Sequence, residues 1–199
     1  MSEDQRRLLR RWRIPLALTT VLIVLQAAGL RESLEYRRAA VLQGELWRLL
    51  TGNLVHLGWA HLSRDVAGLV LMWALFEGRL AERTWLWVLA ASALSVGVGL
   101  LACSPGISWY VGVSGVLFGM FSAGALSVSR KQPLYAGCLL LGMIAVIVWT
   151  FYAGALPGEL AGLGGKIVPQ AHLYGAIGGA SSVLICGSSR TRAAAAGRV

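Results

Sequence analysis

The chain of 199 residues is poor in charge, because Asp, Glu, Lys and Arg together make up only 14% of it. Soluble domains carry about 25% charged residues, and the hydrophobic fraction here is 56%. A soluble globule of this size could not bury that much apolar surface, and a disordered chain requires the opposite composition. The composition therefore predicts an integral membrane protein, and the mean hydropathy of +0.65 agrees.

Cysteine and histidine are also scarce, with three of each. Cys103, Cys138 and Cys186 lie apart inside apolar runs, without the CxxC or Cys/His spacing of a metal site. We interpret them as small core residues and expect no metal and no cofactor. Acidic residues number nine against 18 basic ones, but the basic residues form no single patch, so we expect no nucleic-acid partner.

Long apolar runs dominate the sequence, and a membrane-spanning helix needs about 20 mostly apolar residues. The uncharged stretch 84–129 is long enough for two spans, separated by the turn-like segment 103–106. Four further runs, each long enough for one span, cover about 14–30, 54–76, 132–155 and 167–187. The sequence therefore predicts an all-α, polytopic membrane protein with six spans over 14–187 and basic tails at 1–13 and 188–199.

The basic residues indicate the orientation of these spans, since cytoplasmic loops carry an excess of Lys and Arg. With the N-terminus inside, the inner segments hold most of them: Arg6, Arg7, Arg10, Arg11, Arg13, Arg79, Arg83, Arg130, Lys131, Arg190, Arg192 and Arg198. The outer segments hold fewer: Arg31, Arg37, Arg38, Arg48 and Lys166. We therefore expect both termini in the cytoplasm. A cleaved signal peptide is the alternative for the first run, but five further spans favour a retained helix.

In this topology the few polar groups of the spans meet near the outer membrane face. His56 and His61 lie at the outer end of the second span, and His172 lies near the outer end of the sixth. Ser114 lies in the first turns of the fourth span, which we expect to begin near Ser108. Ionisable residues within spans are costly and usually functional. A serine beside a neutral histidine is the minimal activated nucleophile.

Glycines surround the candidate nucleophile. Gly112 and the segment 115–119 leave bare backbone around Ser114, which a substrate carbonyl or another helix can approach closely. The segments 115–119 and 175–179 are both small-xxx-small motifs, for which ordinary helix packing is the common explanation. Such packing would also bring the fourth and sixth spans into contact, so that Ser114 and His172 face each other.

These residues resemble the motifs of the rhomboid family of intramembrane serine proteases. The segment 112–115, Gly-Val-Ser-Gly, looks like the family's GxSG nucleophile motif, and 171–179 looks like its AHxxGxxxG general-base motif. Three further matches are Glu45-Leu46-Trp47-Arg48 with Thr51 in the first outer loop, the pair His56 and His61, and the ExR-like Glu77-Gly78-Arg79. The motifs occur in the family's order from about residue 45 to 180, so the resemblance covers most of the chain.

The resemblance implies a serine endopeptidase that works by acyl transfer through a Ser/His dyad. His172 would take the proton of the Ser114 hydroxyl, which would attack the scissile carbonyl and form an acyl-enzyme. Because no carboxylate accompanies the pair in the sequence, packing has to orient His172. The resemblance puts the ring of Phe118 against this histidine, with plain core packing as the alternative. Tyr174 is a second candidate for orienting it.

The tetrahedral oxyanion would receive hydrogen bonds from the Ser114 backbone N–H and, by family analogy, from His61. The family often has an asparagine four residues after this histidine, where this chain has Asp65. An ionised carboxylate only accepts hydrogen bonds. We hypothesise that Asp65 holds His61, at i, i+4, in one tautomer or keeps it charged. The alternative is that Asp65 pairs with a neighbouring cation such as Arg64 or Arg48.

Five other motif residues are interpreted as structural: His56, Trp47, Arg48, Glu77 and Arg79. For His56 we favour a hydrogen bond that pins the first outer loop, with support of the oxyanion site as the alternative.

Within the family, the short six-span chain and the segment 168–172, Val-Pro-Gln-Ala-His, most resemble the rhombosortases. That resemblance implies a single-span membrane protein substrate with a C-terminal sorting signal of Gly-Gly, a span and a basic tail. It also implies multi-pass insertion in the lipid bilayer of a bacterial inner (cytoplasmic) membrane, with the active site toward the outer face. We expect the fifth span or the glycine-rich loop 154–166 to control lateral access of the substrate.

Three other classes of protein remain as alternatives. A catalytically silent rhomboid-like protein would bind transmembrane segments without cutting them, and Asp65 is the reason to consider it. A metal-dependent hydrolase would need three clustered ligands, but His56 and His61 are spaced poorly for one helical face and no HExxH occurs. A transporter or scaffold built on glycine-rich helix packing would be expected to show an inverted repeat, and none is obvious.

Overall fold

The computed structural model describes residues 2–154 and 167–196. Its long helices are α1 (Glu3–Ala27), α5 (Trp59–Phe76), α6 (Glu82–Cys103), α7 (Ser114–Val128), α8 (Pro133–Ala153) and α9 (Pro169–Ala196). The short elements between α1 and α5 are α2 (Arg31–Leu34), the strand β1 (Tyr36–Arg37), α3 (Arg38–Leu42) and α4 (Arg48–Thr51). The strand β2 (Trp109–Tyr110) pairs antiparallel with β1. The described chain is thus mostly helical, as predicted, with long helices in the order of the apolar runs.

Two of the described helices, α6 and α8, are long and apolar enough by themselves to cross a membrane. The helix α7 is apolar but has 15 residues, and α5 carries Arg64 and Asp65. The helices α1 and α9 extend through much of the sequence of the two predicted basic tails, to Glu3 and Ala196. The count of six spans therefore stays a prediction from the sequence.

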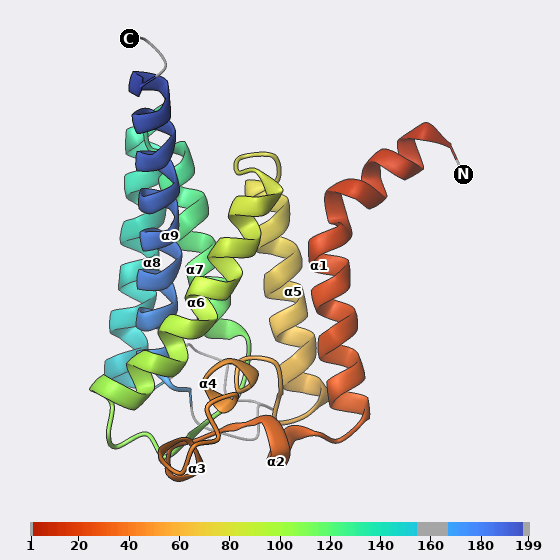
Figure 1. Ribbon diagram of the computed structural model, residues 1–199, viewed down its shortest axis with the longest axis vertical. Coiled ribbons are helices and arrows are strands. Elements are labelled where there is room, and N and C mark those ends of the chain that lie inside the picture. Colours follow the sequence, from red (N-terminus) through yellow and green to blue (C-terminus); the bar gives the residue numbers. More distant parts are fainter. Residues whose placement is uncertain (1, 155–166, 197–199) are drawn as a thin grey trace.

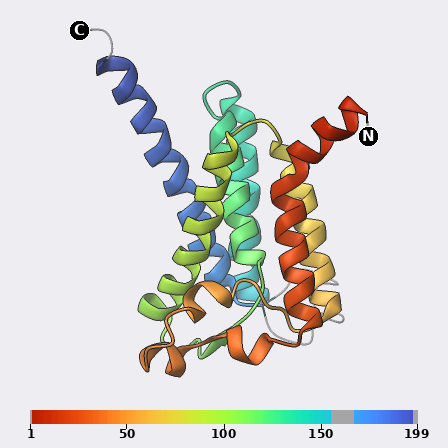
Figure 2. The same ribbon diagram turned by 45° about the vertical axis from the view of Figure 1, so that its right-hand side comes forward.

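The long helices lie side by side as a bundle (Figure 1). The short helices α2, α3 and α4 and the start of α7 lie at one end of the bundle, whereas α1 begins and α9 ends at the other. Figure 2 shows α1 beside α5 on the side of the bundle away from α9. The helix α9 packs against α6 and α7. The first turns of α7 and α9 lie next to each other, since a Cβ on Gly115 would come close to the carbonyl oxygen of Ala171.

Glycines allow α7 and α9 to approach so closely. A Cβ on Gly175 would overlap the carbonyl oxygen of Gly115, and one on Gly179 would overlap the carbonyl oxygen of Gly119. Side chains at these positions would push the two backbones apart. The prediction that the two small-xxx-small motifs bring these helices into contact is confirmed.

The helix α1 bends in its first half (Figure 1), and the bend has a local cause. Pro15 lies inside the helix and has no N–H for the carbonyl of Arg11, four residues earlier. Trp73 on α5 donates its Nε1–H to that carbonyl at 3.0 Å. The bend is thereby attached to α5.

Two predicted boundaries are wrong. The helix α7 begins at Ser114 rather than near Ser108, because the preceding chain is extended where Trp109 and Tyr110 pair with β1. A ladder of two-residue strands is too short to produce the alternation by which strands are predicted. The helix α5 begins at Trp59, so His56 precedes the helix instead of lying on it.

The interpretation of the cysteines as core residues is also wrong. Cys103 and Cys138 are exposed on the bundle, and Cys186 is half-buried. The physical reason is the solvent: lipid tails are as apolar as a protein core, so a small apolar thiol loses nothing on the outer surface of a membrane bundle.

Candidate active site

Ser114 and His172 lie together where α7 and α9 begin. The Nε2 atom of His172 is 3.2 Å from the Oγ atom of Ser114, and the imidazole is buried. A Cβ on Gly115 would lie 2.8 Å from the carbonyl oxygen of Ala171. Backbone contact directly beside both residues thus fixes the distance between the hydroxyl and the imidazole.

The ring of Phe118 stacks on His172, with ring centroids 4.3 Å apart and planes inclined by 11°. Phe118 is four residues after Ser114, so the two side chains share a face of α7. The Nδ1 atom of His172 is buried and has no hydrogen-bond partner in the described residues. Stacking therefore orients this imidazole where a carboxylate does not. The hydroxyl of Tyr174, the second candidate, lies 2.9 Å from Ser104 instead.

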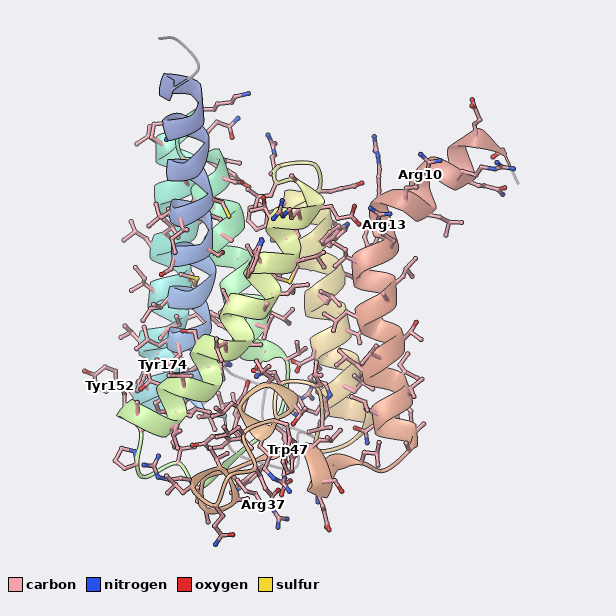
Figure 3. The ribbon with its side chains drawn as sticks, in the orientation of Figure 1. Arg10, Arg13, Arg37, Trp47, Tyr152 and Tyr174 are labelled. Atoms are coloured by element: carbon pink, nitrogen blue, oxygen red, sulfur yellow. The ribbon has the colours of Figure 1, made fainter. Side chains whose placement is uncertain are left out.

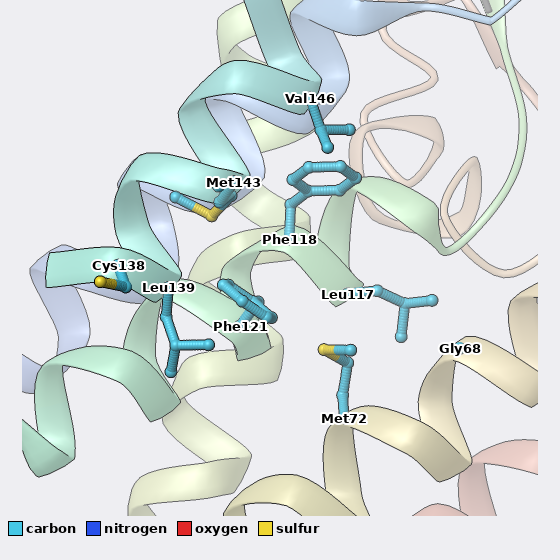
Figure 4. Close-up of a pocket in the computed structure, with 10 residues that line it drawn as sticks. Gly68, Met72, Leu117, Phe118, Phe121, Cys138, Leu139, Met143 and Val146 are labelled. Carbon is cyan, nitrogen blue, oxygen red and sulfur yellow. The ribbon is translucent and has the colours of Figure 1, made fainter. Parts of the chain in front are cut away.

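An apolar cavity of about 410 Å³ lies beside Phe118, between α5, α7 and α8. Figure 4 shows its lining, with Phe118 and Phe121 on α7, Met143 and Val146 on α8 and Met72 on α5. Phe118 thus belongs both to the wall of the cavity and to the stack on His172.

The carboxylate of Asp65 reaches the loop that precedes Ser114. Its Oδ2 atom accepts the backbone N–H of Val113 at 3.0 Å, and lies 3.1 Å from the Nε2 atom of His56. The Nε2 atom of His61 is farther away, at 3.6 Å. Asp65 therefore acts as a hydrogen-bond acceptor that joins the loop before α7 to α5.

Arg48, one of the two cations considered as partners of Asp65, binds elsewhere. Its guanidinium donates to the carboxylate of Glu45 at 2.5 Å and to the carbonyl oxygens of Glu32 and Glu35 at 3.0 and 2.8 Å. Arg48 is buried and ties these parts of the first outer loop together, in agreement with its structural interpretation.

The position of the proton on neutral His61 follows from its neighbours. The backbone N–H of Leu57 donates to Nδ1 of His61 at 3.4 Å. A ring nitrogen that accepts a hydrogen bond carries no proton, so the proton of the neutral ring is on Nε2. This Nε2 faces Gly112, where a Cβ would lie 2.9 Å from it. His61 thus presents an N–H beside the Gly-Val-Ser-Gly turn.

The rings of His56 and His61 lie edge to face with centroids 5.1 Å apart, closer than their spacing suggested. They can meet because His56 precedes α5 while His61 is in its first turn. The contact of His56 with Asp65 pins the segment before α5 to the helix itself. Within residues 2–154 and 167–196, no group of three or more His, Cys, Asp or Glu side chains could hold a metal ion.

Gly112 holds the turn before the candidate nucleophile in a conformation that favours glycine, with φ of +115°. Its N–H donates to the carbonyl of Gly52 at 3.1 Å, and its carbonyl accepts the hydroxyl of Tyr110 at 2.6 Å. A Cβ would lie 2.8 Å from Cε1 of His61. Sequence reasoning missed both of these partners of Gly112. Tyr110 escaped notice because an aromatic residue in an apolar run predicts only core packing.

Comparison with known proteins identifies the family of this chain. Residues 43–189 match the family described as Rhomboid domain. The Bacillus subtilis (strain 168) protein named "Putative rhomboid protease YdcA" is 27% identical over 165 residues, which cover 81% of this chain and 78% of that protein. "Uncharacterized protein ML1171" of Mycobacterium leprae (strain TN) is 30% identical over 82% of this chain and 66% of its own length.

A further relative is "Rhomboid protease GluP" of Bacillus subtilis (strain 168), which is 25% identical over 139 residues. That match covers 70% of this chain but 26% of the relative, and the match to the Mycobacterium leprae protein also spans less than two thirds of its length. The family match itself spans most of the chain, and its range includes the positions of Ser114 and His172. The chain therefore belongs to the rhomboid family of integral membrane proteins.

Proposed function

We propose that this protein is an intramembrane serine endopeptidase with Ser114 as nucleophile and His172 as general base. The observation that carries the proposal is the 3.2 Å distance between Nε2 of His172 and Oγ of Ser114. His172 takes the hydroxyl proton as Ser114 attacks the scissile carbonyl, and then returns a proton to the leaving amine. Hydrolysis of the acyl-enzyme by water completes the reaction.

The start of α7 supplies the oxyanion site in this mechanism. Ser114 is the first residue of the helix, so its backbone N–H has no partner within the helix. The Nε2–H of His61 faces the same turn across Gly112 and is the second donor. Asp65 supports both donors indirectly, because it holds Val113 on one side and contacts His61 on the other.

The substrate's transmembrane segment reaches the dyad laterally, between α5 and α8. The apolar cavity beside Phe118 supports this route, because it lies between these two helices and borders the base. The fifth long helix, α8, contributes Met143 and Val146 to the cavity wall. The rest of the predicted gate, residues 155–166, lies outside the described residues.

The proposed topology has six spans, both termini in the cytoplasm of a bacterium and the dyad toward the outer face of its inner membrane. Two observations support it: α1 begins and α9 ends at the end of the bundle away from Ser114, and the segments that the topology places inside hold most of the Lys and Arg residues of the sequence. The proposed substrate is a single-span protein with a C-terminal Gly-Gly, span and basic-tail signal. This rhombosortase-like specificity rests on the short chain and on the segment 168–172.

The test is cleavage in membranes of a tagged reporter that ends in Gly-Gly, one span and a basic tail. Ser114→Ala and His172→Ala should both abolish the product at matched expression. The control Ser129→Ala removes a hydroxyl just after the end of α7 that donates to the carbonyl of Leu126, and should leave cleavage unchanged because it lies at the opposite end of α7 from Ser114. A second reporter carries an unrelated span. A general rhomboid protease would cut both reporters, whereas a rhombosortase-like protease would cut only the reporter that ends in Gly-Gly, one span and a basic tail.

A catalytically silent member of the family is the competing function. It would bind the reporter without releasing product, and Ser114→Ala would not change that binding. A serine-directed activity probe decides the matter if neither reporter is cut. Labelling that depends on Ser114 indicates an enzyme with another substrate, and absence of labelling refutes the protease proposal.

A further inference from the structure

A second cavity, of about 350 Å³, lies at the end of the bundle opposite to Ser114, where α1, α5 and α6 meet. Unlike the cavity beside Phe118, it is lined by charge: Arg10, Arg11, Glu77 and Glu82, together with Trp73 and Trp85. Figure 3 shows Arg10 and Arg13 on the bent part of α1 at this end. The proposed active site does not use this cavity.

The two carboxylates of the cavity differ in how they are satisfied. Both oxygens of Glu82 accept hydrogen bonds from the guanidinium of Arg13. The Oε1 atom of Glu77 is buried, but within the described residues it accepts no hydrogen bond, and Nε of Arg11 is 3.7 Å away. Arg10 takes no part in either pair. The cavity thus holds a buried carboxylate oxygen, Oε1 of Glu77, that lacks a hydrogen-bond donor. It also holds the guanidinium of Arg10, which belongs to neither of these ion pairs.

The two tryptophans show the same contrast. Trp73 donates its Nε1–H to the Arg11 carbonyl, whereas the Nε1–H of Trp85 is buried and without a hydrogen-bond acceptor among the described residues. Trp85 is 1% exposed, and its ring lies 5.5 Å from that of Trp73. Buried polar groups in folded proteins are nearly always hydrogen-bonded. An acceptor for Trp85 and a donor for Glu77 are therefore both missing from the wall of one cavity.

We propose that this cavity binds the phosphoethanolamine headgroup of a membrane lipid. The phosphate oxygens accept hydrogen bonds from Arg10, Arg11 and the Nε1–H of Trp85, and the ammonium donates to Oε1 of Glu77. Inorganic phosphate would bring no cation to the carboxylate of Glu77, and a choline headgroup has no N–H to offer. The phosphoethanolamine group would come from a membrane lipid, because tryptophans and arginines at the ends of apolar helices lie at the level of the lipid headgroups.

The test uses the full chain purified in detergent, with bound lipid counted by native mass spectrometry. The probes are short-chain phosphatidylethanolamine, phosphatidylcholine and phosphatidylglycerol, and free O-phosphoethanolamine. We expect phosphatidylethanolamine to bind at least tenfold more tightly than phosphatidylcholine and phosphatidylglycerol. Equal affinities, or tighter binding of phosphatidylglycerol, would overturn the headgroup assignment. Free O-phosphoethanolamine binding as tightly as the lipid would overturn the lipid source.

Two variants test the contacts separately. Trp85→Phe keeps the ring but removes the N–H, and Glu77→Gln keeps the shape but removes the charge that attracts the ammonium. Each should lower the affinity for phosphatidylethanolamine at least fivefold, and Glu77→Gln should also remove the preference over phosphatidylcholine. Arg83→Ala, an exposed position that does not line the cavity, is the matched control and should bind as wild type.

Wild-type affinity in both cavity variants would refute the site. If Glu77→Gln fails to fold, Trp85→Phe decides alone, because it preserves the packing. The readout is lipid binding, so its outcome is independent of whether the protein cleaves a substrate.

Discussion

The Oδ2 atom of Asp65 accepts the backbone N–H of Val113 at 3.0 Å, one residue before the candidate nucleophile. The sequence had raised the question of how a carboxylate could replace an asparagine at an oxyanion site. The contact indicates a different role for Asp65. An ionised carboxylate is well suited to accept hydrogen bonds from this N–H and from the Nε2–H of His56. Asp65 holds the turn that carries Ser114, and in the proposed mechanism other groups donate to the oxyanion.

Asp65→Asn should keep cleavage within a few-fold of wild type, because an amide oxygen can accept the same two hydrogen bonds. Asp65→Leu has similar size but no acceptor, and leaves the Val113 N–H buried and unpaired. Such a group costs about 1–3 kcal/mol, which corresponds to roughly a five- to 150-fold loss of kcat/KM if the turn is displaced. Reporter cleavage per folded protein measures the effect. Equal inactivity of both variants would show that the negative charge itself is essential.

Gly112→Ala should abolish detectable cleavage, because the new Cβ would lie 2.8 Å from the His61 ring and the residue has φ of +115°. Gly44→Ala is the matched control, since Gly44 has φ of +104° but nothing within 4 Å of a Cβ. Both variants should lose about 1 kcal/mol of stability from backbone strain, and only Gly112→Ala should lose activity beyond that. Similar activities for the two would contradict a role of this contact in catalysis.

Phe118→Leu should lower kcat about tenfold or less, since aromatic stacking contributes about 0.5–1.5 kcal/mol beyond area burial. Phe121→Leu is the control, because Phe121 lines the same cavity but packs edge to face on Phe76, away from His172. We expect Phe121→Leu to alter KM while kcat stays near wild type. Steady-state kinetics on a purified reporter separates the two constants. An unchanged kcat in Phe118→Leu would mean that stacking does not orient the base.

Gly175→Ala should destabilise the bundle by about 1–3 kcal/mol, the usual cost of overpacking, or prevent folding altogether. The reason is that its Cβ would overlap the carbonyl oxygen of Gly115 and force α9 away from α7. Gly137→Ala on α8 meets nothing within 4 Å and should be neutral or mildly stabilising. Thermal unfolding in detergent compares the two variants. Equal transition temperatures would argue against close backbone contact between α7 and α9.

The histidines of the candidate site could be selected from the sequence because they are rare in this chain, whereas Ser114 is one of 15 serines and was singled out by the glycines around it. There are three histidines, and an ionisable group inside an apolar run is costly enough to need a reason. The contact between α7 and α9 was also predictable, since glycines four residues apart form a flat helix face. The sequence could not identify the hydrogen-bond partner of Asp65 or the stacking geometry of Phe118.

What the sequence by itself determined is the architecture of an apolar helical bundle with its polar groups near one end, because hydrophobic run length and charge bias act along the chain. Only the tertiary structure decided which polar atoms meet. Asp65 and Val113 are 48 residues apart, and His172 and Ser114 are 58 apart. A hydrogen bond depends on tenths of an ångström and on direction, and those are set by how close the glycine faces of α7 and α9 come and by the extended chain before α7.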